Sequence, residues 1–267
     1  FRVSGGLRVE RSRQVSASFE LFAPEKTPVE SVLETVDVLP AATLSYELRK
    51  GMLLRLGYGR TLNRPDFLEM SPVCVEPYVG GEATCGARAD GIELRRAVLD
   101  NLDLRWEWYP GAGESISLAL FYKNIDDPIE TVMRASSDRG ATFRNADRAT
   151  IVGLELDLRQ RFDFVADALE DLYLGGNATW VHSTVSLPPG GQETSRERSL
   201  EGQSPYVFNV QLGYDNVDSG TSVTLLYNVF GPRLRAVGVL EQPDIFELPV
   251  HQLDFVARQA LGRGFKL

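Results

Sequence analysis

The stretch from Leu102 to Pro110, LDLRWEWYP, decides the fold, because apolar and charged side chains alternate along it. Successive side chains leave opposite faces of an extended strand, so the pattern predicts a strand with one apolar and one ionic face. The apolar face carries Leu102, Leu104, Trp106 and Trp108, and the ionic face carries Asp103, Arg105 and Glu107. A soluble sandwich and a membrane barrel both contain such strands, so the rest of the chain has to distinguish them.

The same alternation recurs along the chain. In IVGLELDLRQRF (151–162) the side chains opposite Leu156 and its apolar neighbours are Glu155, Asp157, Arg159 and Arg161. In YVFNVQLGYD (206–215) the apolar face is Tyr206, Phe208, Val210, Leu212 and Tyr214, opposite Asn209 and Gln211. Further strands are expected near 2–11, 40–49, 51–61, 115–123, 171–183, 221–230 and 248–258. The sequence predicts an all-β antiparallel meander of about ten strands.

The connections between these strands alternate between tight turns and long polar stretches. Short turns are expected at 50–51, 110–113, 163–171 and 215–220, and long loops at 12–38, 63–97, 124–148, 186–204 and 231–247. Strict alternation puts all short turns at one end of the sheet and all long loops at the other. Outer-membrane barrels have this arrangement, with short periplasmic turns and long extracellular loops.

Strand length agrees with a membrane crossing. Tyr206 and Tyr214 lie on the apolar face about 20 Å apart along the membrane normal, if a rise of about 3.3 Å per residue and a tilt near 40° are assumed. We therefore expect a lipid-facing surface and aromatic girdle that include Trp106, Trp108, Tyr206, Phe208 and Tyr214. The expected lumen-facing side chains are Asp103, Arg105, Glu107, Glu155, Asp157, Arg159 and Arg161, which can pair with one another across strands, with a plug, or with a ligand.

Composition limits the partners and the compartment. The chain has 28 basic and 37 acidic side chains, for a net charge of −9, which argues against a nucleic-acid partner. Its mean hydropathy of −0.15 suits a barrel or a soluble protein. Cys74 and Cys85 lie in one polar, Gly-rich stretch. They are either two free thiols or a loop disulfide of an oxidising compartment, and we predict the disulfide.

Little in the sequence points to catalysis. His182, Ser183 and His251 are not accompanied by a G-x-S-x-G elbow or a zinc-protease motif. Asp126 and Asp127 precede a proline and are expected to cap a turn rather than bind calcium, because no EF-hand spacing follows. The sequence therefore predicts no enzymatic activity, no cofactor and no metal site.

Several segments together resemble the C-terminal part of the barrel of TonB-dependent outer-membrane receptors. They are LRLGYGRTLNRPDFLEMSP (54–72), LDNLDLRWEWYPGAGESISLALFYKNIDDPIE (99–130), GLELDLRQRF (153–162), YVFNVQLGYD (206–215) and LLYNVFGPRL (225–234). Each segment alone is weak evidence, but their order also agrees with the family and they span nearly the whole chain.

The resemblance implies a receptor in the outer membrane of a Gram-negative bacterium, with a barrel of about 22 strands closed by a plug. Such a receptor binds a scarce nutrient, such as a siderophore, cobalamin or an oligosaccharide, and imports it with energy passed from the TonB system to the plug region. Residues 1–267 would then be one partial barrel domain without the plug, ending where a strand begins at GRGFKL (262–267). A carbohydrate-binding β-sandwich and a passive porin remain the alternatives.

Overall fold

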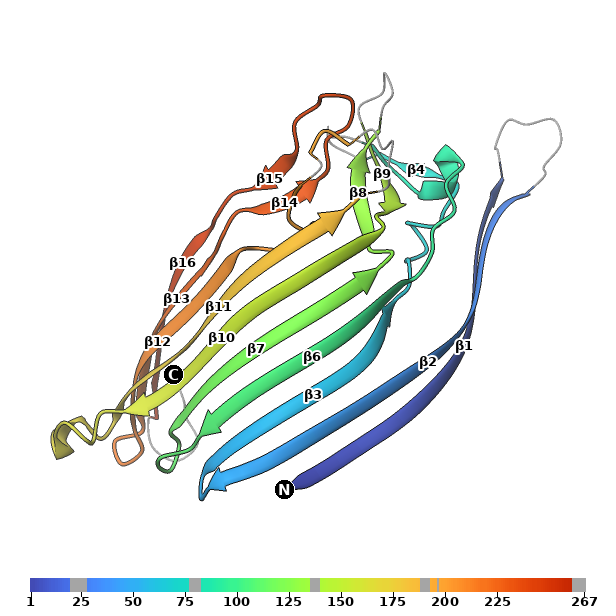
Figure 1. Ribbon diagram of the computed structural model, residues 1–267. Coiled ribbons are helices and arrows are strands. Elements are labelled where there is room, and N and C mark those ends of the chain that lie inside the picture. Colours follow the sequence, from blue (N-terminus) through green and yellow to red (C-terminus); the bar gives the residue numbers. More distant parts are fainter. Residues whose placement is uncertain (20–27, 77–82, 135–139, 188–192, 196, 261–267) are drawn as a thin grey trace.

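The computed structural model describes residues 1–19, 28–76, 83–134, 140–187, 193–195 and 197–260. Ten strands form one antiparallel sheet in chain order, which confirms the predicted meander. They are β1 (Arg2–Phe19), β2 (Pro28–Arg49), β3 (Met52–Asn63), β6 (Ala97–Trp108), β7 (Ser115–Asp126), β10 (Arg148–Arg161), β11 (Leu172–Ser186), β12 (Tyr206–Asn216), β13 (Thr221–Phe230) and β16 (His251–Gln259). Figure 1 shows a curved sheet with the short turns at one end and the longer connections at the other.

The long connections at the upper end of Figure 1 contain further secondary structure. β4 (Cys74–Val75), β5 (Ala83–Cys85), β8 (Ile129–Met133) and β9 (Gly140–Asn145) form a four-stranded sheet, and β14 (Arg233–Ala236) pairs with β15 (Ile245–Glu247). A short 3₁₀ helix, η1 (Ala87–Asp90), follows β5. We call the described residues of 64–96, 127–147, 187–204 and 231–250 the rim layer.

Two expectations about the connections were wrong. The expected loop at 12–38 is largely strand, because β1 and β2 pair without a break from Arg2 with Ser45 to Phe19 with Pro28. Charged residues such as Arg13 and Glu34, which suggested a loop, pair across these strands at 2.7 Å. The expected loops at 63–97, 124–148 and 231–247 each contain strands of the rim layer. The stretch 262–267 lies outside the described residues.

The two faces of the large sheet have opposite character and inverted burial. On β7, the apolar side chain of Leu120 is 51% exposed, whereas Ser117 on the other face is 5% exposed. On β6, Leu104 is exposed and Glu107 is buried. A soluble protein normally buries its large apolar side chains and exposes its carboxylates. We call the two surfaces the apolar face and the polar face.

Aromatic rings on the polar face lie over glycines of neighbouring strands. Phe121 is paired with Gly153, and a Cβ added to that glycine would come within 2.1 Å of the Phe121 ring. Tyr173 covers Gly213 in the same way, again at 2.1 Å. Such aromatic cover of glycine is a recognised device in curved sheets. It explains why Phe121 interrupts the polar pattern of its face.

At its rim end, the polar face carries a buried hydrophobic core like that of a globular protein. Ala97, Ile125, Ile151 and Val185 of the large sheet are buried there, and Leu200 of the rim layer packs against them. A second cluster joins Val132 and Met133 of β8 to residues of the 234–239 segment. Neither 3₁₀ helix of the described residues, η1 or η2 (Asp167–Leu169), is long or apolar enough to cross a membrane.

Candidate functional site

An ion-pair network crosses the polar face near the end of the sheet that carries the short turns. Glu107 accepts from Arg55 Nε at 2.9 Å and lies 3.2 Å from Arg105 Nε. Arg105 Nη2 also donates to Ser117 Oγ at 2.9 Å and to Asp157 Oδ2 at 3.0 Å. The Ser117 hydroxyl donates to the same Asp157 oxygen. The network therefore joins β3, β6, β7 and β10 through their side chains.

The other charged residues that the sequence assigned to this surface are placed differently. The Arg159 guanidinium lies over the Tyr173 ring, 4.9 Å from its centroid. Arg161 donates to the backbone oxygen of Glu170 at 2.8 Å. Asp103 and Glu155 share the polar face with the network but form no ion pair with any described residue. The structure thus brings together three of the seven predicted residues.

On β11, β12 and β13 the polar face carries a ladder of side-chain amides instead of an ion-pair network. Asn209 Nδ2 donates to Asn177 Oδ1 at 2.8 Å, and Asn228 Nδ2 donates to Asn209 Oδ1. The three residues are register partners on β11, β12 and β13. A cavity of about 300 Å³ lies over this ladder, with Gln211 and Gln252 in its lining. Of these side chains, sequence reasoning singled out only Asn209 and Gln211.

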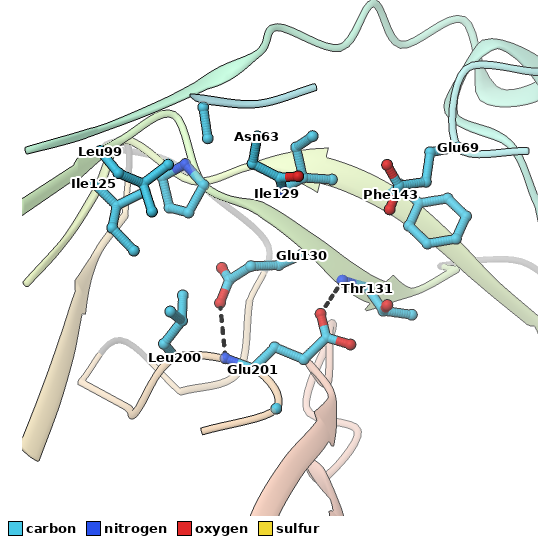
Figure 2. A pocket seen from close by; sticks show the side chains of 13 residues that line it. Asn63, Glu69, Leu99, Ile125, Ile129, Glu130, Thr131, Phe143, Leu200 and Glu201 are labelled. Carbon is cyan, nitrogen blue, oxygen red and sulfur yellow. Dashed lines mark hydrogen bonds between the residues drawn. The ribbon is translucent and has the colours of Figure 1, made fainter. Parts of the chain in front are cut away.

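A cavity of about 350 Å³ lies between the polar face and the rim layer. We call it the rim cavity. Figure 2 shows its lining, in which Leu99, Ile125 and Phe143 provide apolar surface. Three carboxylates, from Glu69, Glu130 and Glu201, also line it.

The rim layer is fastened at this cavity by a buried ion pair. Glu130 of β8 pairs with Arg198 through two hydrogen bonds of 2.6 and 2.7 Å. The two side chains are only 2% and 5% exposed, so the charges are removed from water together. Paired, hydrogen-bonded geometry of this kind is what makes a buried charge tolerable. The contact joins β8 to a segment 68 residues later in the chain.

Glu201 and Glu69 are the titratable groups of the rim cavity whose environment is unusual. Burial raises the pKa of the Glu201 carboxyl, although the Thr131 backbone N–H donates to it and acts in the opposite direction (Figure 2). Burial likewise raises the pKa of Glu69, which accepts from the Asp66 backbone N–H at 2.8 Å. Both groups therefore bind a proton more readily than an exposed glutamate.

Comparison with known proteins identifies the family. Residues 1–241 match the family described as "TonB dependent receptor-like, beta-barrel". The chain belongs to the TonB-dependent receptor family. Members of this family are receptors and transporters and not enzymes. The single ten-stranded sheet also contradicts the β-sandwich alternative.

Solved TonB-dependent receptors have the same fold. The ferric-catecholate import receptor Fiu of E. coli K12 superimposes with a TM-score of 0.62 at 13% identity, covering 99% of this chain and 36% of that one. The copper transporter OprC gives 0.66 at 16% identity, over 99% and 38%. The siderophore receptor PiuA of Acinetobacter baumannii gives 0.67 at 11% identity, over 98% and 34%. The chain therefore spans between 34% and 38% of the length of these receptors.

Four of the five aromatic residues that the sequence assigned to the apolar face of this TonB-dependent receptor barrel lie in two groups. The rings of Trp106 and Trp108 are 6.5 Å apart on β6. Phe208 packs against Tyr206 at 5.4 Å and against Trp180 at 5.2 Å. Trp180 was missed, although its place in the alternating segment 171–183 could have identified it. Tyr214, also on β12, is register partner of Leu172.

The cysteines and histidines are held at separate places. Cys74 and Cys85 are register partners on β4 and β5, and their sulfur atoms are bonded. His182 lies on β11 and His251 on β16, with β12 and β13 between these strands in the sheet. His251 Nδ1 is 2.7 Å from the Tyr227 hydroxyl. Neither histidine lines the rim cavity.

Proposed function

We propose that this chain is part of the barrel of a receptor in the outer membrane of a Gram-negative bacterium. The receptor binds a scarce nutrient at the cell surface and imports it with energy from the TonB system. The partners are the outer-membrane lipid, the small nutrient ligand, and TonB acting through a plug region outside residues 1–267.

The inverted burial of the large sheet carries the proposal. Large apolar side chains such as Leu120 and Leu104 are exposed along the strands, whereas Glu107 and Ser117 are buried. Exposing a leucine to water costs about 1.5–3 kcal/mol relative to burying it, so a row of them needs an apolar solvent. The apolar face, including Trp106, Trp108, Tyr206, Phe208 and Tyr214, would contact lipid, and the polar face would line a water-filled lumen.

The rim layer is proposed to be the extracellular end. Long connections of outer-membrane barrels face the outside, and the bonded Cys74 and Cys85 suit an oxidising compartment. The rim cavity then lies at the end of the sheet that faces an arriving ligand. Its mixture of apolar walls and carboxylates would contact a ligand with apolar surface and hydrogen-bond donors. The solved relatives favour a siderophore, while cobalamin, an oligosaccharide and copper remain candidates.

Uptake measurements test the function. Cells that carry or lack the complete gene would be supplied with ⁵⁵Fe-labelled catecholate siderophore, labelled cobalamin or copper, each in a strain with and without tonB. We expect uptake of one ligand to require both genes. Uptake that persists without tonB would favour the passive porin.

Neighbouring residues of β10 test the orientation of the sheet. In the complete receptor, Glu155→Cys places a thiol on the polar face and Leu156→Cys places one on the apolar face, one residue away on the same strand. A water-soluble maleimide should label the first variant and not the second in intact membranes. The reverse pattern would contradict the proposed lumen and lipid sides.

A further inference from the structure

The turn between β10 and β11, residues 162–171, exposes apolar side chains at the end of the sheet opposite the rim layer. Phe164 is 70% and Val165 is 60% exposed. The ring of Phe162 stacks on that of Phe164, with centroids 6.3 Å apart and an interplanar angle of 24°. In Figure 1 this turn extends beyond the strand ends at the lower left.

The backbone holds these side chains in place. The Phe162 N–H donates to Leu172 O at 3.1 Å, and the Val165 N–H donates to Phe162 O at 3.0 Å. A short 3₁₀ helix, η2 (Asp167–Leu169), follows, and the Leu169 N–H donates to Ala166 O at 2.9 Å. The exposed rings are therefore presented by a folded turn rather than by a loose loop.

The apolar surface of the turn lies just beyond the apolar face of the sheet. Alternation puts Phe162 on the same face as Leu156 and Leu158 of β10, with Phe164 stacked beyond it. One polar side chain, Gln160, which donates to Glu114, lies between Leu158 and Phe162 on this face. Two other turns at the same end also present apolar side chains: Tyr109 between β6 and β7 is exposed, and Val217 between β12 and β13 is 86% exposed.

Acidic side chains on the same turn provide a polar side. Asp163, Asp167 and Glu170 are exposed and have no basic partner among the described residues. A segment with stacked aromatic residues beside unpaired carboxylates suits a boundary between apolar and aqueous surroundings. Carboxylates disfavour an anionic lipid surface, so a zwitterionic headgroup region is the more compatible one.

We propose that Phe162, Phe164 and Val165 anchor the β10–β11 turn in the headgroup–acyl boundary of the periplasmic phospholipid leaflet. The inference rests on the orientation proposed above and extends it from the strands to a turn. Rigid aromatic residues at this depth contribute apolar contact while the neighbouring acids stay in water. The anchor would fix the depth and tilt of β10 and β11.

Depth-dependent fluorescence quenching tests the anchor. Phe164→Trp would be introduced into the complete receptor, which is then reconstituted in phosphatidylcholine vesicles whose acyl chains carry bromine at a shallow or a deep position. The signal is the emission difference between the variant and its parent. Phe67→Trp is the matched control, because Phe67 is 63% exposed but lies in the rim layer. Leu120→Trp reports on the centre of the apolar face.

We expect the Phe164→Trp signal to lose more emission with the shallow than with the deep bromine, Leu120→Trp to show the opposite order, and Phe67→Trp to be unaffected. If Leu120→Trp is quenched and Phe164→Trp is not, the anchor is overturned and the orientation stands. If Leu120→Trp is not quenched either, the orientation itself fails. A blue-shifted but unquenched Phe164→Trp would indicate protein contact and would also overturn the anchor.

Discussion

The two faces of the large sheet are built from the same strands and differ in how each stabilises the protein. On β7 and its neighbours the apolar face presents exposed leucines that no described residue covers. The polar face carries ion pairs and amide ladders, and towards the rim it becomes apolar and is covered by folded segments. One face thus depends on its solvent, whereas the other is held by specific side-chain contacts.

This difference teaches where substitutions should have large effects. On the apolar face the surrounding medium supplies the favourable environment, so shape changes matter little and charge matters greatly. On the polar face a side chain matters according to how many buried partners it leaves unsatisfied. The following predictions separate these two rules.

Removing the buried charge partner in the rim layer should have the largest effect. Arg198→Met leaves the Glu130 carboxylate buried without its two charged hydrogen bonds. Breaking a buried pair from one side costs about 3–5 kcal/mol. We expect the described rim layer to lose protection in hydrogen exchange, read by mass spectrometry of peptides from 128–134.

A second variant distinguishes a lost ion pair from a general packing defect. The double variant Glu130→Gln with Arg198→Met removes both charges, and it should recover a large part of the lost protection, because no uncompensated charge remains. Equal damage in the single and double variants would show that packing, rather than charge, holds the rim layer.

A charge on the apolar face should have the next largest effect. Leu120→Arg places a guanidinium in the middle of the exposed apolar row of β7. An arginine facing lipid at the bilayer centre destabilises a barrel by about 2–4 kcal/mol. The measurement is the unfolding free energy of the complete receptor in phospholipid bilayers.

Thr224→Arg is the control, because Thr224 is opposite Gly213 on the polar face of β13. It should change the unfolding free energy by much less than Leu120→Arg. Equal losses for the two variants would contradict the assignment of the apolar face to lipid.

The rim cavity should make the stability of the rim layer depend on pH. Burial raises the pKa of Glu201 and of Glu69 above the usual value of 4.5. The folded state then binds these protons more tightly than the unfolded state, so their contribution is fully present below about pH 4.5 and is lost as pH rises through the raised pKa values. Denaturant midpoints of the rim layer should therefore fall with rising pH in this window. Glu201→Gln should flatten the dependence, and an unchanged slope would contradict the assignment to Glu201.

The strands of the large sheet were predictable because their signal is local. Alternation in LDLRWEWYP and IVGLELDLRQRF identified β6 and β10 and which of their residues share a face. The first two strands were predicted too short, since Arg13 and Glu34 are charged but pair with each other across the strands. A cross-strand partner about twenty residues away is invisible to a reading of local hydrophobicity.

The candidate site was only partly predictable, because its contacts join distant segments. Arg105, Glu107 and Asp157 stood out by their place on alternating strands, and the structure joins them. Glu130 and Arg198 lie 68 residues apart in polar stretches that suggested loops, and neither is marked by a motif. The importance of Glu130 and Arg198 depends on their burial. This burial results from the folding of the rim layer and cannot be read from the residues next to them in the sequence.

The smallest effect is expected for an ion pair on the apolar face of the same sheet. Arg60 of β3 and Asp100 of β6 are register partners on the apolar face, closer to the rim layer than Leu104. They form two hydrogen bonds of 2.9 Å. Their side chains remain 41% and 26% exposed, and such pairs contribute about 0.2–1 kcal/mol. Arg60→Gln should therefore lower the unfolding free energy only slightly, and added salt should remove the difference. Arg105→Gln should cost more and respond less to salt, because it leaves the nearly buried Glu107 carboxylate (10% exposed) and the buried Ser117 hydroxyl without their charged neighbour. If the two substitutions had equal effects in low and in high salt, the ion-pair network of the polar face would be no better shielded from water than the Arg60–Asp100 pair. The two faces would then differ only in their apolar residues.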